Sequence, residues 1–177
     1  MHLEDAIPHI FDVEGTWSDH PDDPGGATML GVTFATFKRA VDADLVDGPK
    51  TRDRLRELTR KEAMRIYRAL YWREAGCHRL PDGVDLVVFD AAVNQGVTRA
   101  VRFLQRAAGA KADGIFGPQT HQAAMNADRD RLLRDLTVYR GLHYTSLGKF
   151  GVFGKGWLRR LLDTYRLAVL HTHSGDG

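Results

Sequence analysis

Apolar side chains recur at the three- and four-residue spacing of an α-helix along almost the whole chain. Helices with one apolar face must pack that face against other elements, so this pattern predicts a mainly α fold. Residues 18–32 interrupt the pattern, because they contain two prolines and three glycines. We therefore expect short strands or an irregular loop near residues 18–32, surrounded by helices.

Local sequence signals mark where several of the helices begin. Thr33 and Thr98 each precede an apolar helical pattern and can cap it, because threonine accepts a hydrogen bond from a free backbone N–H of the first turn. Thr59 followed by Glu62 forms a capping-box pattern. Pro118 stands where a first-turn proline belongs. These signals predict helices that start next to each of these positions.

The length of 177 residues suits one domain, or one domain with a tightly packed extension. Hydrophobic residues make up 43% of the chain, which is enough for a sizeable core. We expect a single domain over residues 1–177, with one half at 1–80 and a second, helical half at 81–170. Residues 76–83 form a soft boundary between the halves and do not resemble a flexible linker.

Charge, cysteine content and histidine spacing exclude several classes of function. The net charge of +2 favours approach to an acidic polymer such as a bacterial wall, but it is too weak to indicate nucleic-acid binding. Cys77 is the only cysteine, which excludes an internal disulfide and fits a reducing compartment. The eight histidines show no metal-ligand spacing, so we expect no metal and no cofactor.

The chain gives no sign of a membrane span or a secretory signal. No run approaches the roughly 18 apolar residues that a span needs. The first residues include acidic side chains where a signal peptide would be basic. We therefore expect synthesis in the cytoplasm and no stable membrane association.

Glu14 is the first candidate for chemistry, because it continues an apolar helical stripe formed by Leu3, Ile7 and Ile10. A carboxyl group among apolar side chains is desolvated, which raises its pKa and keeps it protonated near neutral pH. A general acid for glycoside cleavage needs that property. The alternative is a helix-end glutamate turned to solvent.

Asp22, Asp23 and Thr28 follow Glu14 in the Pro- and Gly-rich segment. Either aspartate supplies a second carboxylate, which glycosidic cleavage uses to handle water or to stabilise positive charge. Asp23 immediately precedes Pro24, which holds it in extended backbone, and we favour it over Asp22. The alternative is that both aspartates are turn residues. The Thr28 hydroxyl positions water or contacts the sugar, or else makes only a loop hydrogen bond.

Residues 14–33 read Glu-Gly-Thr-Trp…Asp-Pro-Gly-Gly-Ala-Thr…Gly-Val-Thr. This pattern resembles the signature of glycoside hydrolase family 108, whose members are lysozyme-like N-acetylmuramidases, many of them phage endolysins. The resemblance implies a lysozyme-like, two-lobed helical fold, with Glu14 as the general acid and Asp23 and Thr28 as its partners. Asp22, beside Asp23, is then a candidate to bind substrate.

The chain departs from that signature at Thr16 and Trp17, where the family usually has glycine and tyrosine. Trp17 is still aromatic, so it can stack on a sugar or pack in the fold. Trp72 is a second aromatic candidate for sugar binding, although most tryptophans of this kind are core residues. Arg160, in a Gly-Trp-Leu-x-Arg segment that also matches the family, is a candidate to pair with a carboxylate in the cleft or to lie on the surface.

Two further motifs lie in the second half. Residues 90–96 read Asp-Ala-Ala-Val-Asn-Gln-Gly and resemble an element of the family's predicted peptidoglycan-binding region, so Asn94 and Gln95 are candidates to bind sugar. A structural asparagine that ties a helix end to a loop is an equal alternative. Residues 104–120 resemble the Leu-Gln…Asp-Gly-x-x-Gly-x-x-Thr turn of peptidoglycan-binding modules, and we interpret that motif as architecture without catalysis.

The resemblance covers about residues 7–160 and implies an endolysin that hydrolyses the β-1,4 bond between N-acetylmuramic acid and N-acetylglucosamine in bacterial peptidoglycan. Without a signal peptide, a holin-type pore would release it from the host cytoplasm to the wall, and we expect a monomer. The alternatives are a lytic transglycosylase, a non-catalytic peptidoglycan-binding module, and a lysin carried by the virion.

Overall fold

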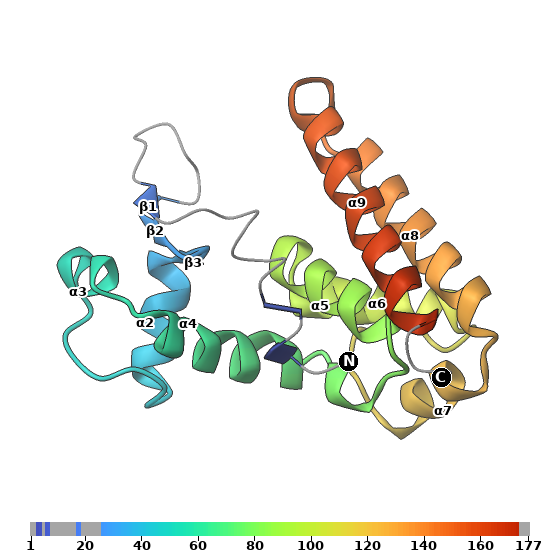
Figure 1. Ribbon diagram of the computed structural model, residues 1–177, viewed down its shortest axis with the longest axis horizontal. Helices are drawn as coiled ribbons and strands as arrows, with labels where there is room; N and C mark the ends of the chain where they lie inside the picture. Colours follow the sequence, from blue (N-terminus) through green and yellow to red (C-terminus); the bar gives the residue numbers. More distant parts are fainter. Residues whose placement is uncertain (1–2, 5, 8–16, 19–25, 174–177) are drawn as a thin grey trace. The chain divides into compact units, whose positions relative to one another are not determined.

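The computed structural model describes residues 3–4, 6–7, 17–18 and 26–173, and the chain forms two compact units that meet in sequence between Tyr71 and Trp72. We refer to them as the N-terminal unit and the C-terminal unit. Most of the described residues are helical, with a small antiparallel sheet in the N-terminal unit (Figure 1). The predicted fold class, mainly α with a short β region near residues 18–32, is confirmed. No helix in the described part of the chain has the length and apolarity to cross a membrane.

The N-terminal unit combines the sheet with short helices. The three strands lie in the order β1-β2-β3, and all neighbours are antiparallel. Before β1 in the sequence, the structure describes residues 3–4 and 6–7, which are helical. The apolar residues among them are buried. The elements are β1 (Trp17–Ser18), β2 (Thr28–Met29), β3 (Val32–Thr33), α2 (Phe34–Asp42), α3 (Arg52–Arg56), α4 (Arg60–Tyr67) and the π-helix η1 (Arg68–Arg73), which continues past Tyr71.

The helix starts of this unit follow the predicted signals. The Thr33 Oγ1 atom accepts a hydrogen bond of 3.1 Å from the Thr36 N–H and begins α2. Thr59 and Glu62 exchange both hydrogen bonds of a capping box at the start of α4. These caps are confirmed, because they depend on neighbours in sequence only. The change from α- to π-helix after Tyr67 has no counterpart in the sequence prediction.

The C-terminal unit is helical. In it α5 is buried on nearly every side, and it packs against α6, α8, α9 and η2, while α8 and α9 lie side by side (Figure 1). A central helix of this kind needs apolar residues around its whole circumference, and its sequence supplies them. The elements are η2 (Cys77–Arg79), α5 (Val84–Gln95), α6 (Val97–Ala107), α7 (Pro118–Asn126), α8 (Arg129–Thr145) and α9 (Phe150–His173).

Two helix starts in this unit test the sequence signals. Pro118 occupies the first turn of α7, as predicted. The prediction that Thr98 caps α6 was wrong, because α6 begins at Val97 and Gly96 is its N-cap residue. Gly96 has φ +87°, a left-handed conformation that favours glycine, and its carbonyl accepts from the Arg99 and Ala100 N–H groups. The chain therefore passes from α5 into α6 at this glycine, before Thr98.

Candidate active site

Thr28 lies in the β-hairpin of the N-terminal unit, which is the described part of the predicted active site. Glu14, Asp22 and Asp23 lie outside the described residues, so their catalytic roles stay predictions. Thr28 pairs with Ser18 on one side and with Thr33 on the other, so its backbone is held from both neighbouring strands. It is only partly buried. A hydroxyl on a central strand is well fixed, which is what a water-positioning group requires.

The turn between β2 and β3 is built from Leu30 and Gly31, both with positive φ (51° and 72°). Positive φ at both residues of a two-residue loop is typical of a β-hairpin turn, because the twist of this turn fits that of the flanking strands. Leucine adopts this conformation rarely, and here the surroundings compensate for it. The Leu30 side chain is buried, and its carbonyl accepts a hydrogen bond of 2.9 Å from the buried Tyr67 hydroxyl of α4. The helical part of the unit thereby fixes the hairpin that carries Thr28.

The base of the hairpin is also anchored to helices. The Phe34 N–H at the start of α2 donates to the Ala27 carbonyl at 2.9 Å. The Thr36 Oγ1 atom of α2 and the Tyr71 hydroxyl of η1 lie 3.2 Å apart in a hydrogen bond. Polar contacts therefore connect α2 both to the sheet and to η1.

Trp17 on β1 is partly buried, and the guanidinium of Arg56 lies 5.1 Å from the centre of its ring. This cation–π contact covers one face of the indole. Sugar stacking by Trp17 stays a prediction, and it requires the opposite face or displacement of Arg56. Trp72 is buried in the C-terminal unit, where its ring meets Phe89 edge-on at 5.3 Å. Its predicted role in sugar binding also stays a prediction, and this core packing does not support it.

Asp90 of α5 is the centre of a buried ionic group in the C-terminal unit, which we call the Asp90 cluster. Its carboxylate accepts from Arg140 Nη2 of α8 at 2.5 Å and from Arg160 Nε of α9 at 2.9 Å. The side chains of Asp90 and Arg140 are completely buried, and that of Arg160 is 10% exposed. Burial opposes ionisation of Asp90, but the two guanidinium groups outweigh it and lower the pKa of this carboxyl.

The motif residues Asn94 and Gln95 adjoin this cluster. Gln95 Oε1 accepts from Arg140 Nε at 3.0 Å, so the buried amide helps to satisfy the guanidinium. The exposed Asn94 donates from Nδ2 to the Asp90 carbonyl at 3.1 Å, within its own helix. Their binding to sugar, and that of Arg160, stays a prediction, while the polar contacts of all three residues around Asp90 are structural.

Sequence reasoning did not identify Arg140, although the signal was present. Arg140 lies four residues after Leu136 and seven after Leu133, on the buried face of α8. A charged residue at helical spacing within an apolar stripe is rarely buried without a partner of opposite charge. Such a position therefore predicts a buried carboxylate elsewhere in the chain, and Asp90 is that carboxylate.

The turn motif of residues 104–120 forms a second buried polar group, which we call the Gln105 cluster. Gln105 Nε2 of α6 donates to Asp113 Oδ1 at 2.8 Å, to Thr120 Oγ1 at 3.0 Å and to the Ile115 carbonyl at 3.1 Å. Gln105 Oε1 accepts from the Gly114 N–H at 2.8 Å. One amide thus connects α6, the turn and the first part of α7, as the architectural interpretation of this motif predicted.

Two glycines let the turn approach its neighbours closely. Gly114 has φ +84°, and a Cβ atom there would lie 2.7 Å from Thr98 Cγ2. Gly76 has φ +72°, and a Cβ atom there would lie 2.3 Å from the ring of Phe116. The turn is therefore packed directly on the segment after η1 and on the first turn of α6.

We also examined the described residues for a reactive thiol and for a metal site. Cys77 is buried, and burial raises the pKa of its thiol well above the usual range, which makes it a poor nucleophile. Among the residues that the structure describes, no three His, Cys, Asp or Glu side chains gather in a way that could hold a metal ion.

Comparison with known proteins gives two family matches and a structural relative. Residues 7–96 match the family described as glycosyl hydrolase 108, and residues 99–162 match the family described as a predicted peptidoglycan domain. The structure of SagA from Brucella abortus is 36% identical in sequence, with a TM-score of 0.85 over 96% of this chain and 94% of that chain. No curated protein matches.

Proposed function

The chain belongs to the glycosyl hydrolase 108 family, and from that membership we propose that it hydrolyses the β-1,4 bond between N-acetylmuramic acid and N-acetylglucosamine in bacterial peptidoglycan. The coarser assignment, a glycoside hydrolase that acts on peptidoglycan, follows from the family together with the predicted peptidoglycan domain. The observation that carries the proposal is that both matches occupy consecutive stretches of one chain, residues 7–96 and 99–162.

In the proposed mechanism Glu14 protonates the leaving oxygen of the glycosidic bond. Asp23 orients the attacking water or stabilises the positive charge that develops on the sugar. Thr28 positions that water from the central strand of the hairpin. The support for Glu14 and Asp23 is their place in the sequence motif, and the support for Thr28 is also its fixed position between β1 and β3.

Digestion of purified peptidoglycan by the wild type and by Glu14→Gln tests the proposal. The amide keeps the shape of the side chain but cannot release a proton, so we expect the rate to fall by about 10²–10⁴. Glu57→Gln is the matched control, because it makes the same chemical change at an exposed position of the same unit. If Glu14→Gln keeps more than about a tenth of the wild-type rate, Glu14 is not the general acid.

Mass spectrometry of the released fragments separates the alternative activities. Hydrolysis at this bond leaves N-acetylmuramic acid with a free reducing end, which borohydride reduces. A lytic transglycosylase leaves an anhydro sugar that borohydride does not reduce. Binding to the wall without any released fragment would identify a non-catalytic module and contradict the proposal.

The same assay shows which of the two aspartates, Asp22 or Asp23, acts in catalysis. We expect Asp23→Asn to lose more activity than Asp22→Asn, because the sequence motif places the catalytic carboxylate immediately before Pro24. A larger loss for Asp22→Asn would reverse the assignment. Wild-type activity in both variants would remove the second carboxylate from the mechanism.

We propose a phage or prophage endolysin as the biological setting, made in the host cytoplasm, released through a holin-type pore and active as a monomer. The support is the resemblance of residues 14–33 to a family that contains many endolysins. Expression in a bacterial cytoplasm with and without a co-expressed holin tests this setting. Lysis that requires the holin supports it, and failure to lyse with the holin present contradicts it.

A further inference from the structure

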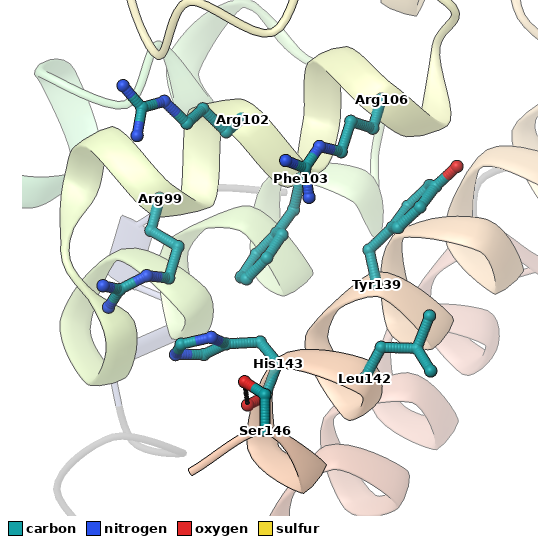
Figure 2. Close-up of a pocket in the computed structure, with 8 residues that line it drawn as sticks. All are labelled: Arg99, Arg102, Phe103, Arg106, Tyr139, Leu142, His143 and Ser146. Atoms are coloured by element: carbon teal, nitrogen blue, oxygen red, sulfur yellow. Dashed lines mark hydrogen bonds between the residues drawn. The ribbon is translucent and has the colours of Figure 1, made fainter.

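A pocket of about 420 Å³ lies between α6 and α8 in the C-terminal unit (Figure 2). Arginines from α6 line one side, and polar and apolar side chains from α8 line the other. Its lining contains no aspartate or glutamate. The pocket therefore differs from the Asp90 cluster, in which every positive charge faces a carboxylate.

Arg99, Arg102 and Arg106 give the pocket its charge. They follow one another at spacings of three and four residues, so they lie along one face of α6. All three side chains are exposed, and no carboxylate of the described residues lies within ion-pair distance of any of them. Arg99 donates to the Gln95 carbonyl at 2.8 Å, and Arg102 donates weakly to the Asp113 carbonyl at 3.5 Å. A carbonyl carries no net charge, so these two hydrogen bonds do not neutralise the guanidinium groups of Arg99 and Arg102.

An aromatic pair lies between the arginines. The rings of Phe103 from α6 and His143 from α8 are 5.8 Å apart and point toward each other in Figure 2. Partial burial and the nearby Arg99 lower the pKa of His143, which favours the neutral imidazole. The Ser146 hydroxyl donates to the His143 carbonyl at 2.7 Å, which ties down the end of α8. The pocket thus has aromatic side chains beside the arginines of α6.

We propose that this pocket binds the stem peptide of peptidoglycan through the carboxylates of that peptide. The inference rests on the proposed function, because it takes the anion from the substrate of the hydrolase. A guanidinium matches a carboxylate in a two-point, planar arrangement. The pocket also lies entirely within residues 99–162, which match the predicted peptidoglycan domain.

The length of the arginine row suits a short peptide. Arg99 and Arg106 are seven residues apart on a helix, which places their backbones about 10 Å apart. An extended peptide covers that length with about three residues. Two carboxylates of one stem peptide can therefore reach the two ends of the row, while the peptide backbone and methyl groups pack over the partly exposed His143.

Binding of a soluble peptidoglycan fragment to the full-length protein tests the proposal. The probe is a disaccharide-tetrapeptide with free peptide carboxylates, compared by calorimetry with the same fragment after amidation of those carboxylates. The test variant is Arg99→Gln with Arg106→Gln. The control is Arg159→Gln with Arg166→Gln, which removes the same charge from exposed positions on α9 that do not line the pocket.

We expect the test variant, and amidation of the fragment, each to weaken binding about tenfold, since two partly exposed ion pairs are lost. The control variant should bind as the wild type does. The NMR signals of the His143 ring should shift when the free-carboxylate fragment binds, and they should not shift in the test variant. Thermal melting of both variants shows whether either change affects the fold.

Equal affinity of the test and control variants overturns the proposal, and so does equal affinity for the free and amidated fragments. Tighter binding of short inorganic polyphosphate than of the fragment also overturns it, because the pocket would then select phosphate. Cleavage of glycan strands freed of peptide is measured in parallel. If the wild type does not cleave these strands, the proposed hydrolysis is contradicted. The ligand of the pocket is decided by the binding experiment alone.

Discussion

The Asp90 cluster and the Gln105 cluster each bury a polar side chain where helices of the C-terminal unit meet, but they satisfy it by different means. Asp90 is a charge neutralised by Arg140 and Arg160, which lie 50 and 70 residues away in sequence. Gln105 is a neutral amide whose partners, Asp113 to Thr120, lie within 15 residues of it. The first cluster connects α5, α8 and α9, and the second closes one local turn.

This difference determines how each cluster responds to loss of a member. A buried ion whose partner is removed retains the full cost of its desolvation, so the Asp90 cluster is sensitive to any single change. A neutral amide that is removed leaves donors and acceptors whose desolvation costs less. The three predictions that follow test this contrast, from the largest expected effect to the smallest.

Replacement of Asp90 by asparagine should lower the free energy of unfolding by about 3–5 kcal/mol, because it leaves the buried Arg140 guanidinium without its counter-ion. Denaturant unfolding measures the loss. Asp163→Asn, the same change at an exposed position of α9, is the control and should stay within about 0.5 kcal/mol of the wild type. If the two variants have the same stability, the ion pairs at Asp90 contribute little.

Replacement of Gln105 by methionine should cost about 2 kcal/mol, because it keeps the length of the side chain but leaves the buried Thr120 hydroxyl and the Gly114 N–H without this partner. Thr120→Val removes only the hydroxyl, which accepts from Gln105 at 3.0 Å and donates to the Ile115 carbonyl at 3.4 Å, and should cost about 1 kcal/mol. The same unfolding experiment measures both variants. A loss at Gln105 as large as that at Asp90 would remove the proposed contrast between ionic and neutral clusters.

Acid should weaken the Asp90 cluster, with a smaller effect than the substitution, because the lowered pKa keeps part of this carboxyl ionised in mild acid. The folded-state pKa of Asp90 is lowered, so its contribution is present above the unfolded-state pKa of about 3.9 and is lost as the pH falls through the folded-state value. Stability measured from about pH 5 downward should therefore fall more steeply in the wild type than in Asp90→Asn.

The Gln105 cluster supplies the control for this pH experiment. Its only ionisable member is Asp113, an exposed residue whose pKa is lowered mainly by the hydrogen bonds from the Ile115 N–H and from Gln105. Because solvent screens that group, Gln105→Met should keep nearly the wild-type pH dependence. Parallel curves for the wild type and Asp90→Asn would show that Asp90 does not determine the acid sensitivity.

Several features followed from the sequence because their causes lie within a few residues. The capping box of Thr59 and Glu62, the cap at Thr33 and the first-turn position of Pro118 each depend on one helical turn. The Gln105 motif is nearly as local, which is why its architectural role was predicted. The break in the helical pattern near residues 18–32, which we expected to hold short strands or an irregular loop, followed from its prolines and glycines.

Other features required the tertiary structure, because they depend on contacts between distant segments or on backbone angles that the sequence pattern does not give. The left-handed Gly96 moved the start of α6 ahead of Thr98, and the Tyr67 hydroxyl fixed the unusual backbone of Leu30 from 37 residues away. The chemical assignment of Glu14 and Asp23 still rests on their motif.

Local sequence patterns were therefore enough to predict the helical class, several helix starts and the family, since periodicity, caps and motifs each depend on neighbouring residues. Which charges are neutralised within the fold, and which remain available to a ligand, depends on how the helices pack. Arg140 and Arg106 are both arginines on helices, yet one is paired with Asp90 in the core and the other borders an open pocket. That distinction follows from which helix faces meet, because burial forces a charge to find a partner whereas solvent does not.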